Sequence, residues 1–274
     1  MTLRRRLDVE LVRRGLAPTR EQAREAVAAG RVLVGGAPAT KPAHLVDPGQ
    51  AVELVGPAPR FVGRGGEKLD AALERFDVPV AGRRALDAGA STGGFTDCLL
   101  QRGAAEVVAV DVGYGQLHER LRADPRVDVR ERTNVRTLDR DAVGGPVDLV
   151  VADLSFISLR TVLPALVPLV DPGGDLVLLV KPQFEAGRQE ASRGAGVVRD
   201  PEVWRRVVGE VARAVGEQGA DRMGVMASPL TGADGNVEFL LHARRPSGAP
   251  VEVSLDVDVD VDGAVAEALS RTGA

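Results

Sequence analysis

The chain has 274 residues, of which 44% are hydrophobic and 27% are charged. This composition is ordinary for a soluble globular protein, and the length suits one large domain or a large and a small domain together. Aromatic residues make up only 3% of the chain, so the core must be built from Val, Leu and Ala. The formal net charge of −4 argues against a uniformly basic nucleic-acid-binding protein.

The charges are distributed unevenly along the chain. Residues 1–60 carry ten basic and six acidic side chains, whereas residues 251–274 carry one basic and six acidic ones. A basic amino-terminal module indicates a polyanionic partner, although charge alone does not identify that partner.

Cysteine content and hydropathy indicate the compartment. The single cysteine, Cys98, excludes an intrachain disulfide framework and favours a reducing environment. The basic segment Met1–Arg6 is not followed by an apolar region, so no secretory signal is predicted. No apolar stretch approaches the roughly 18–20 residues needed to span a bilayer. We therefore expect a cytoplasmic protein without a membrane partner.

Residues 1–58 are expected to form a small α+β domain. Apolar residues recur at helical spacing, and glycines end each periodic segment. The expected elements are a helix over 3–14, a helix from Thr19 to Gly30, a strand and tight turn over 31–36, and a strand over 51–55. The Pro-rich stretch Gly56–Pro59 marks the domain boundary, with a linker over 59–64.

Residues 65–246 alternate between apolar runs and helical segments. The expected strands are Arg84–Ala88, Glu106–Val112, Asp128–Glu131, Asp148–Asp153, Asp175–Lys181, a strand near Val225, and Val237–Ala243. The expected helices are 93–102, 115–123, 158–169 and one that contains Trp204. This alternation predicts an α/β fold that is Rossmann-like, with a mostly parallel sheet covered on both faces. An acidic extension over 247–274 follows, in which Val251–Asp262 alternates like a half-buried edge strand.

The segment Leu86–Phe95 is the strongest indication of a cofactor site. It reads Leu-Asp-Ala-Gly-Ala-Ser-Thr-Gly-Gly-Phe, follows an expected strand and opens an expected helix. An open α/β sheet binds nucleotide-like ligands at this point. Gly89 permits a tight turn and close ligand approach, while Gly93 and Gly94 let the helix begin near the sheet.

Two carboxylates decide which cofactor this turn suits. Asp87 ends its strand where a cationic amino-acid group could be held, and Asp111 follows Gly89 by 22 residues, the position of an acid that binds ribose hydroxyls. A pyrophosphate beside Asp87 would add negative charge, which favours S-adenosylmethionine over NAD. The predicted cofactor contacts are Asp87, Gly89, Ser91, Thr92, Gly93, Gly94, Phe95, Asp111, Asn134 and Asp153, with no metal site. Asn134 could equally contact the adenine or cap an ordinary turn.

Four further segments place polar side chains near the expected cofactor edge. They are Arg64-Gly-Gly-Glu-Lys-Leu ahead of the first helix of the large domain, Ala152-Asp-Leu-Ser-Phe-Ile-Ser-Leu, Val180-Lys-Pro-Gln-Phe-Glu, and Gly235-Asn-Val-Glu-Phe-Leu-Leu within the last strand. Taken singly, a lysine after a strand or an aspartate at its end is usually structural. Glu238 is the least ordinary, because a carboxylate among apolar residues needs a partner.

Together with the glycine turn, these segments resemble the FtsJ/RrmJ-like 2′-O-methyltransferases, and more closely the TlyA (hemolysin A) family. The resemblance covers roughly Leu3–Ala243, and the first sixty residues look like an S4 RNA-binding domain. It implies a Lys-Asp-Lys-Glu catalytic tetrad at Lys68, Asp153, Lys181 and Glu238. It also implies that cytidine 2′-hydroxyls of 16S and 23S ribosomal RNA are the methyl acceptors, so that ribosomal subunits are the partners.

Removing the proton of a ribose hydroxyl requires a base, and a lysine can serve when a second cation and partial burial favour its neutral form. Lys181 is the predicted base, with Lys68 as the neighbouring cation and both carboxylates orienting the ammonium. Arginines of the S4-like segment are predicted to contact RNA phosphates. They are Arg4, Arg6, Arg14, Arg20, Arg24 and Arg31.

Three other functions stay open at this point. An S4-containing pseudouridine synthase would not need the glycine turn of an S-adenosylmethionine site. A pore-forming hemolysin would need spanning or strongly amphipathic membrane segments, which the sequence lacks. A non-catalytic RNA-binding or ribosome-assembly factor would not need intact candidates at all four tetrad positions.

Overall fold

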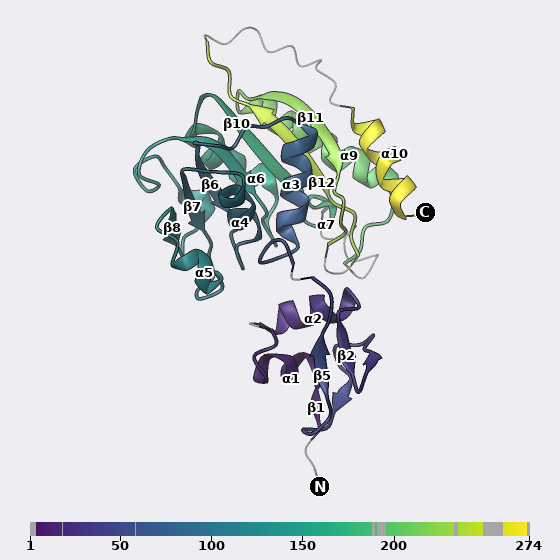
Figure 1. The fold of residues 1–274 in the computed structure, drawn as a ribbon. Helices are drawn as coiled ribbons and strands as arrows, with labels where there is room; N and C mark the ends of the chain where they lie inside the picture. Colours follow the sequence, from purple (N-terminus) through teal and green to yellow (C-terminus); the bar gives the residue numbers. More distant parts are fainter. Residues whose placement is uncertain are drawn as a thin grey trace. The chain divides into compact units, whose positions relative to one another are not determined.

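The computed structural model describes residues 4–17, 19–57, 59–187, 190, 196–232, 235–248 and 260–272. The chain divides into two compact units, Met1–Arg60 and Phe61–Ala274 (Figure 1). The division falls inside the segment 59–64 that the sequence analysis expected as a linker.

The amino-terminal unit is a small α+β fold. Helices α1 (Leu7–Arg13) and α2 (Arg20–Ala28) share an apolar core with the antiparallel sheet β3-β2-β5, whose strands are Ala37–Pro38, Val32–Val34 and Val52–Leu54. The first helix is shorter than the predicted 3–14, because Arg5–Arg6 is extended as β1 and pairs with β4 (Leu45–Val46).

The larger unit is built on a seven-stranded sheet in the order β11-β12-β10-β9-β6-β7-β8. The strands are β6 (Arg84–Ala88), β7 (Glu106–Val110), β8 (Val127–Arg130), β9 (Val147–Ala152), β10 (Val170–Val180), β11 (Asp221–Ala227) and β12 (Phe239–Arg244). Strand β12 is antiparallel to both of its neighbours, whereas the pairs from β10 to β8 are parallel. The predicted mostly parallel sheet is confirmed.

The apolar runs of the central strands are buried on both faces of the sheet. Leu176 and Leu178 of β10 belong to one core cluster, whereas Val177 and Leu179 belong to the other. The second cluster contains residues of α3 (Gly65–Arg75), α4 (Gly94–Gln101) and α5 (Glu119–Arg122). The first contains residues of α6 (Leu159–Leu166), α9 (Pro201–Glu217) and α10 (Val261–Thr272), so helices cover both faces (Figure 1).

Several elements differ from the sequence predictions. The helix expected over 115–123 is only α5, because Gly113 and Gly115 bend the chain before it and donate to Asp111 and Glu131. Glu238 was expected within the last strand, but β12 begins one residue later at Phe239. Lys68 was expected ahead of the first helix and instead lies within α3.

The carboxyl-terminal segment also differs from the expected extension. Its last described residues form α10, which packs on β11 and α9 and buries Ala264, Val265 and Ala268. The predicted strand-like alternation over 251–262 falls largely outside the described residues, and its end, Val261–Asp262, begins this helix. Ala264 and Val265 lie four and three residues before Ala268, on one face of the helix, so α10 belongs to the core of the larger unit.

Candidate active site

The site lies where the strand order reverses. The chain runs from β6 to β7 and β8 on one side and then returns to β9 on the other, so β6 and β9 flank the switch point at which open α/β sheets bind ligands. Ala88 pairs with Ala152, which brings the following residues, Gly89 and Asp153, side by side. A Cβ on Gly89 would lie 2.4 Å from the carbonyl oxygen of Asp153, and its φ is +90°. The turn therefore requires glycine here.

Asp87 is fully buried beside this turn. Its Oδ2 accepts a hydrogen bond of 2.7 Å from Thr96 Oγ1, but Oδ1 has no hydrogen-bond partner among the described residues. Burial, opposed by the hydrogen bonds from Thr96 and reinforced by the charges of Asp153 and Asp111, raises the pKa of Asp87 to about 7. A buried oxygen without a partner costs about 1–3 kcal/mol. A ligand cation at Oδ1 would offset that cost, and the residues present therefore fit a cofactor that carries an ammonium group.

Asp111 closes the other side of the turn. Its Oδ2 accepts from the backbone N–H of Ser91 at 2.8 Å, and its Oδ1 accepts from that of Gly113 at 2.6 Å. Ser91 adopts a φ of +47°, which these contacts stabilise. Asp111 and Asp87 thus border the same short turn with two carboxylates.

The remaining residues of the glycine motif bring helices together. A Cβ on Gly93 would meet Leu121 Cδ1 at 2.2 Å, and one on Gly94 would meet the backbone N of Gly66 at 3.0 Å. Phe95 is buried in the core. These residues set how closely α4 packs against α5 and α3, and their cofactor contacts, like that of Thr92, stay predictions.

Asn134 caps a short helix. Its Oδ1 accepts a hydrogen bond of 3.1 Å from the backbone N–H of Arg136, at the start of η1 (Val135–Thr137). Asn134 therefore acts as a turn cap, one of its two predicted roles, while its contact with an adenine stays a prediction.

The four tetrad residues form two lysine–carboxylate pairs at this edge of the sheet. Lys181 Nζ lies 2.5 Å from Asp153 Oδ1, and Lys68 Nζ lies 2.5 Å from Glu238 Oε2. Val180 pairs with Phe239, so Lys181 and Glu238 adjoin the same end of neighbouring strands. Asp153 is next to the glycine turn. Each lysine thus has its own carboxylate, and the predicted catalytic roles of the four residues stay predictions.

The two pairs differ in exposure mainly at their carboxylates. The side chains of Lys68 and Glu238 are 9% and 3% exposed, and those of Lys181 and Asp153 are 11% and 24% exposed. Asp153 is therefore the most accessible of the four side chains.

Sequence reasoning missed two residues that contact this site, Ser155 and Thr96, and a third, Glu185, that lies near it in sequence. Ser155 Oγ lies 3.2 Å from Lys181 Nζ, and Thr96 is the hydrogen-bond donor to Asp87. Glu185 is buried four residues after Lys181 and holds the start of α6. Ser155 and Glu185 lie within the quoted motifs, so their position in those motifs was the available signal.

The arginines of the amino-terminal unit are held by acidic residues. Asp8 is fully buried and contacts Arg6, Arg20 and Arg24 at 3.0, 3.0 and 3.3 Å. Burial alone would raise the pKa of Asp8, but hydrogen bonds from the three guanidinium groups outweigh it and hold that pKa well below its usual range.

The other predicted RNA contacts also have partners within the unit. Arg14 contacts Glu10 at 2.7 Å and the carbonyl oxygens of Gln50 and Pro48, and only 21% of its side chain is exposed. Arg4 contacts Asp47, and Arg31 donates to the carbonyl of Val55. Arg6, Arg20 and Arg24 remain about half exposed, so this cluster of three arginines is an accessible cationic surface.

Comparison with known proteins identifies a family for each unit. Residues 61–245 match the profile of the FtsJ-like methyltransferases, and residues 5–52 match the S4 domain. The chain is 58% identical to the 16S/23S rRNA (cytidine-2'-O)-methyltransferase TlyA of Mycobacterium tuberculosis, over 89% of this chain and 91% of that protein. It is 48% identical to the putative rRNA methyltransferase YqxC of Bacillus subtilis, over 88% and 86%. A solved structure of a putative hemolysin from Streptococcus thermophilus matches with a TM-score of 0.78 and 39% identity, over 100% of this chain and 98% of that one.

The name hemolysin raises the question of a membrane-spanning segment. Among the residues that the structure describes, no helix has the length and apolar character that crossing a bilayer requires.

Proposed function

The chain belongs to the FtsJ-like methyltransferase family, and from this premise we propose that it transfers a methyl group from S-adenosylmethionine to the ribose 2′-hydroxyl of cytidines in 16S and/or 23S ribosomal RNA. The name of the relative from M. tuberculosis supports this acceptor. The observation that carries the proposal is the contact of Lys181 with Asp153 beside the turn at Gly89. An enzyme with this substrate would work in the cytoplasm.

The residues around the turn fit the cofactor. Asp87 Oδ1 would accept from the ammonium of the methionine part, and Asp111 would accept from the ribose hydroxyls. The absence of a Cβ at Gly89 leaves the backbone open to close approach. When bound here, S-adenosylmethionine supplies an electrophilic methyl carbon.

Lys181 is the general base of the proposed reaction. Its Nζ, in the unprotonated form, takes the proton of the 2′-hydroxyl, and Asp153 stabilises the ammonium that forms. Ser155 fixes the direction of the amine. Lys68 and Glu238 form a buried ion pair, so we assign them to joining the start of β12 to the start of α3.

The amino-terminal unit supplies RNA affinity. The three arginines around Asp8 present cationic groups suited to phosphates, and such contacts position an RNA without reading its sequence. Binding through them should weaken steeply as salt concentration rises.

The direct test is incubation of the chain with methyl-labelled S-adenosylmethionine and unmodified ribosomal subunits, followed by mapping of 2′-O-methyl positions. We expect label at a small number of cytidines. Lys181→Met should lower the transfer rate by about 10²–10⁴-fold, the usual contribution of a positioned base, and leave cofactor affinity unchanged. Retained transfer by this variant, or label on a base instead of a ribose, would contradict the proposal.

A further inference from the structure

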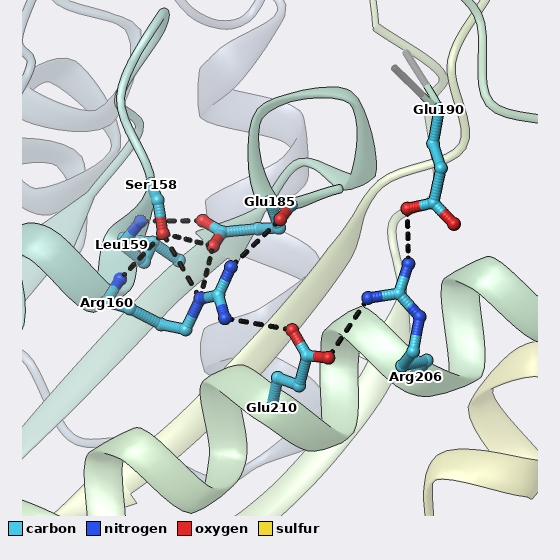
Figure 2. A network of polar contacts seen from close by, with 7 residues as sticks. All are labelled: Ser158, Leu159, Arg160, Glu185, Glu190, Arg206 and Glu210. Atoms are coloured by element: carbon cyan, nitrogen blue, oxygen red, sulfur yellow. Dashed lines mark hydrogen bonds and ion pairs between the residues drawn. The ribbon is translucent and has the colours of Figure 1, made fainter. Parts of the chain in front are cut away.

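A buried carboxylate outside the proposed chemistry joins two segments of the site. Glu185 ends α7 (Pro182–Glu185) and is 4% exposed. Its Oε2 accepts a hydrogen bond of 2.5 Å from Ser158 Oγ, and its Oε1 accepts one of 2.6 Å from the backbone N–H of Leu159 (Figure 2). Both oxygens are therefore committed to the first turn of α6.

The two segments that Glu185 joins are the ones that carry Lys181 and Asp153. Asp153 follows β9 and lies five residues before Ser158, and Lys181 follows β10 and lies four residues before Glu185. The segments meet twice, at one end through Lys181 and Asp153 and at the other through Glu185 and Ser158. Two separate contacts fix the relative position of two short segments more firmly than one contact does.

The segment after Asp153 needs such a second contact. Phe156 has a φ of +63°, a conformation that costs a non-glycine residue about 1–2 kcal/mol. Phe156 is 92% exposed, and the centroid of its ring lies 5.2 Å from that of Phe184 in α7. A strained and exposed turn persists only where its surroundings hold it in place.

Exposed ion pairs extend from Glu185 to α9. Arg160 donates to the backbone carbonyl of Glu185 at 2.9 Å and contacts Glu210 at 2.9 Å, and Glu210 contacts Arg206 at 3.0 Å (Figure 2). The side chains of Arg160 and Arg206 are 40% and 44% exposed. Exposed pairs each contribute little, typically about 0–1 kcal/mol. The hydrogen bonds of the buried Glu185 carboxylate therefore account for most of the attachment of α7 to the start of α6.

We propose that Glu185 is a positioning residue that holds Lys181 and Asp153 in register for proton abstraction; this rests on the proposed function. Glu185 does not contact the cofactor turn, because its carboxylate faces the start of α6. Its removal should therefore slow the chemical step and spare ligand binding.

The test compares Glu185→Ala with Glu185→Gln. A glutamine can still accept from the Leu159 N–H and can donate to Ser158 Oγ, whereas alanine can do neither. We expect kcat to fall about 10–100-fold in the alanine variant, the size of effect that a misplacement of about 1 Å produces, with KM for RNA and Kd for S-adenosylmethionine within about twofold. Glutamine should restore kcat to within about threefold of the wild type.

Two further variants keep the test decisive if Glu185→Ala folds poorly. Ser158→Ala removes one of the two hydrogen bonds and should lower kcat by about 3–10-fold, roughly what one lost hydrogen bond is worth. Glu210→Gln breaks only the exposed chain and should leave kcat unchanged. A Ser158→Ala variant with wild-type kcat, or a Glu185→Ala variant that loses kcat and cofactor affinity in parallel, would overturn the proposal.

Hydrogen exchange separates this inference from the proposed function. The amides of residues 153–158 should exchange faster in Glu185→Ala than in the wild type, whether or not the wild-type protein methylates RNA. Unchanged exchange in that segment would overturn the positioning role. An inactive wild-type protein with the expected exchange would instead reject the proposed function.

Discussion

Two buried aspartates of the central sheet have opposite surroundings. Asp175 of β10 and Asp87 of β6 are both 0% exposed. Asp175 contacts Arg83 at 2.7 Å, His242 at 2.8 Å and Arg244 at 2.9 Å. Asp87 has the hydroxyl of Thr96 and no partner for its second oxygen among the described residues.

The pKa values of the two groups diverge accordingly. Burial alone would raise the pKa of Asp175, but hydrogen bonds shared with His242, Arg83 and Arg244 outweigh it and hold that pKa well below its usual range. Burial without cationic partners raises the pKa of Asp87 to about 7. A buried carboxylate with a full set of partners is part of the fold, whereas one with a free oxygen is prepared for a ligand.

The largest effect is expected from removing the fully partnered carboxylate. Asp175→Ala leaves the buried His242 and two guanidinium groups without their acceptor, which should lower the free energy of unfolding by about 3–5 kcal/mol. Thermal melting measures this loss. Asp128→Ala, which breaks an exposed pair with Arg130, is the control and should cost at most about 1 kcal/mol. Equal losses in the two variants would remove the distinction drawn here.

Removing the charge of Asp87 should act on ligand binding instead. Asp87→Asn loses a charge-assisted hydrogen bond worth about 1.5–3 kcal/mol, so affinity for S-adenosylmethionine should fall about 10–150-fold in calorimetric titration. The unliganded variant should be more stable than the wild type at pH 8, by an amount on the order of 2–4 kcal/mol, because asparagine has no charge to bury. A destabilised variant with intact cofactor affinity would contradict the ligand role.

The raised pKa of Asp87 also predicts a pH dependence. In the folded protein the carboxyl group of Asp87 keeps its proton up to about pH 7, whereas in the unfolded chain it loses the proton near pH 3.8. The contribution of Asp87 to the free energy of unfolding therefore falls as pH rises from about 3.8 to about 7, and it is constant above pH 7. A cationic ligand needs the ionised form. Cofactor affinity should therefore rise by up to about tenfold per pH unit toward pH 7 and then level off. In Asp87→Asn this rise should vanish, and a wild-type affinity that does not change with pH would show that Asp87 is not the binding group.

Local sequence patterns predicted well the strands of the sheet and the site residues that follow the strand ends. The expected strand Arg84–Ala88 matches β6, whose apolar residues Ala85, Leu86 and Ala88 are all buried in the sheet. Asp87, Asp153 and Lys181 were each expected at the carboxyl end of a strand, and each lies at or just after the end of β6, β9 or β10.

Pairing between distant segments could not be predicted in the same way. Lys181 pairs with Asp153 and Lys68 with Glu238 because β10 lies between β9 and β12, an order that no local pattern encodes. The helix α10 was missed because the alternation of Val and Asp before it dominated the pattern. The arginines of the first unit were treated as free cations, although Asp8 and Glu10 of α1 lie close to several of them in sequence.

The smallest expected effect tests whether that arrangement of arginines matters for RNA. Asp8→Asn raises the net positive charge of the unit, and charge alone would then predict tighter RNA binding. Because Asp8 holds Arg6, Arg20 and Arg24 together, we expect the opposite, a loss of RNA affinity of about 3–10-fold as the cluster separates, which is roughly 1 kcal/mol. Asp47→Asn makes the same charge change at an exposed pair with Arg4 and is the matched control, with affinity unchanged or slightly higher.

Fluorescence anisotropy with a ribosomal RNA fragment at several salt concentrations measures the RNA affinity of both variants. Melting curves establish that each unit is folded at the assay temperature. Tighter binding by both variants would mean that the number of charges decides RNA affinity, and that the buried carboxylate serves only the fold.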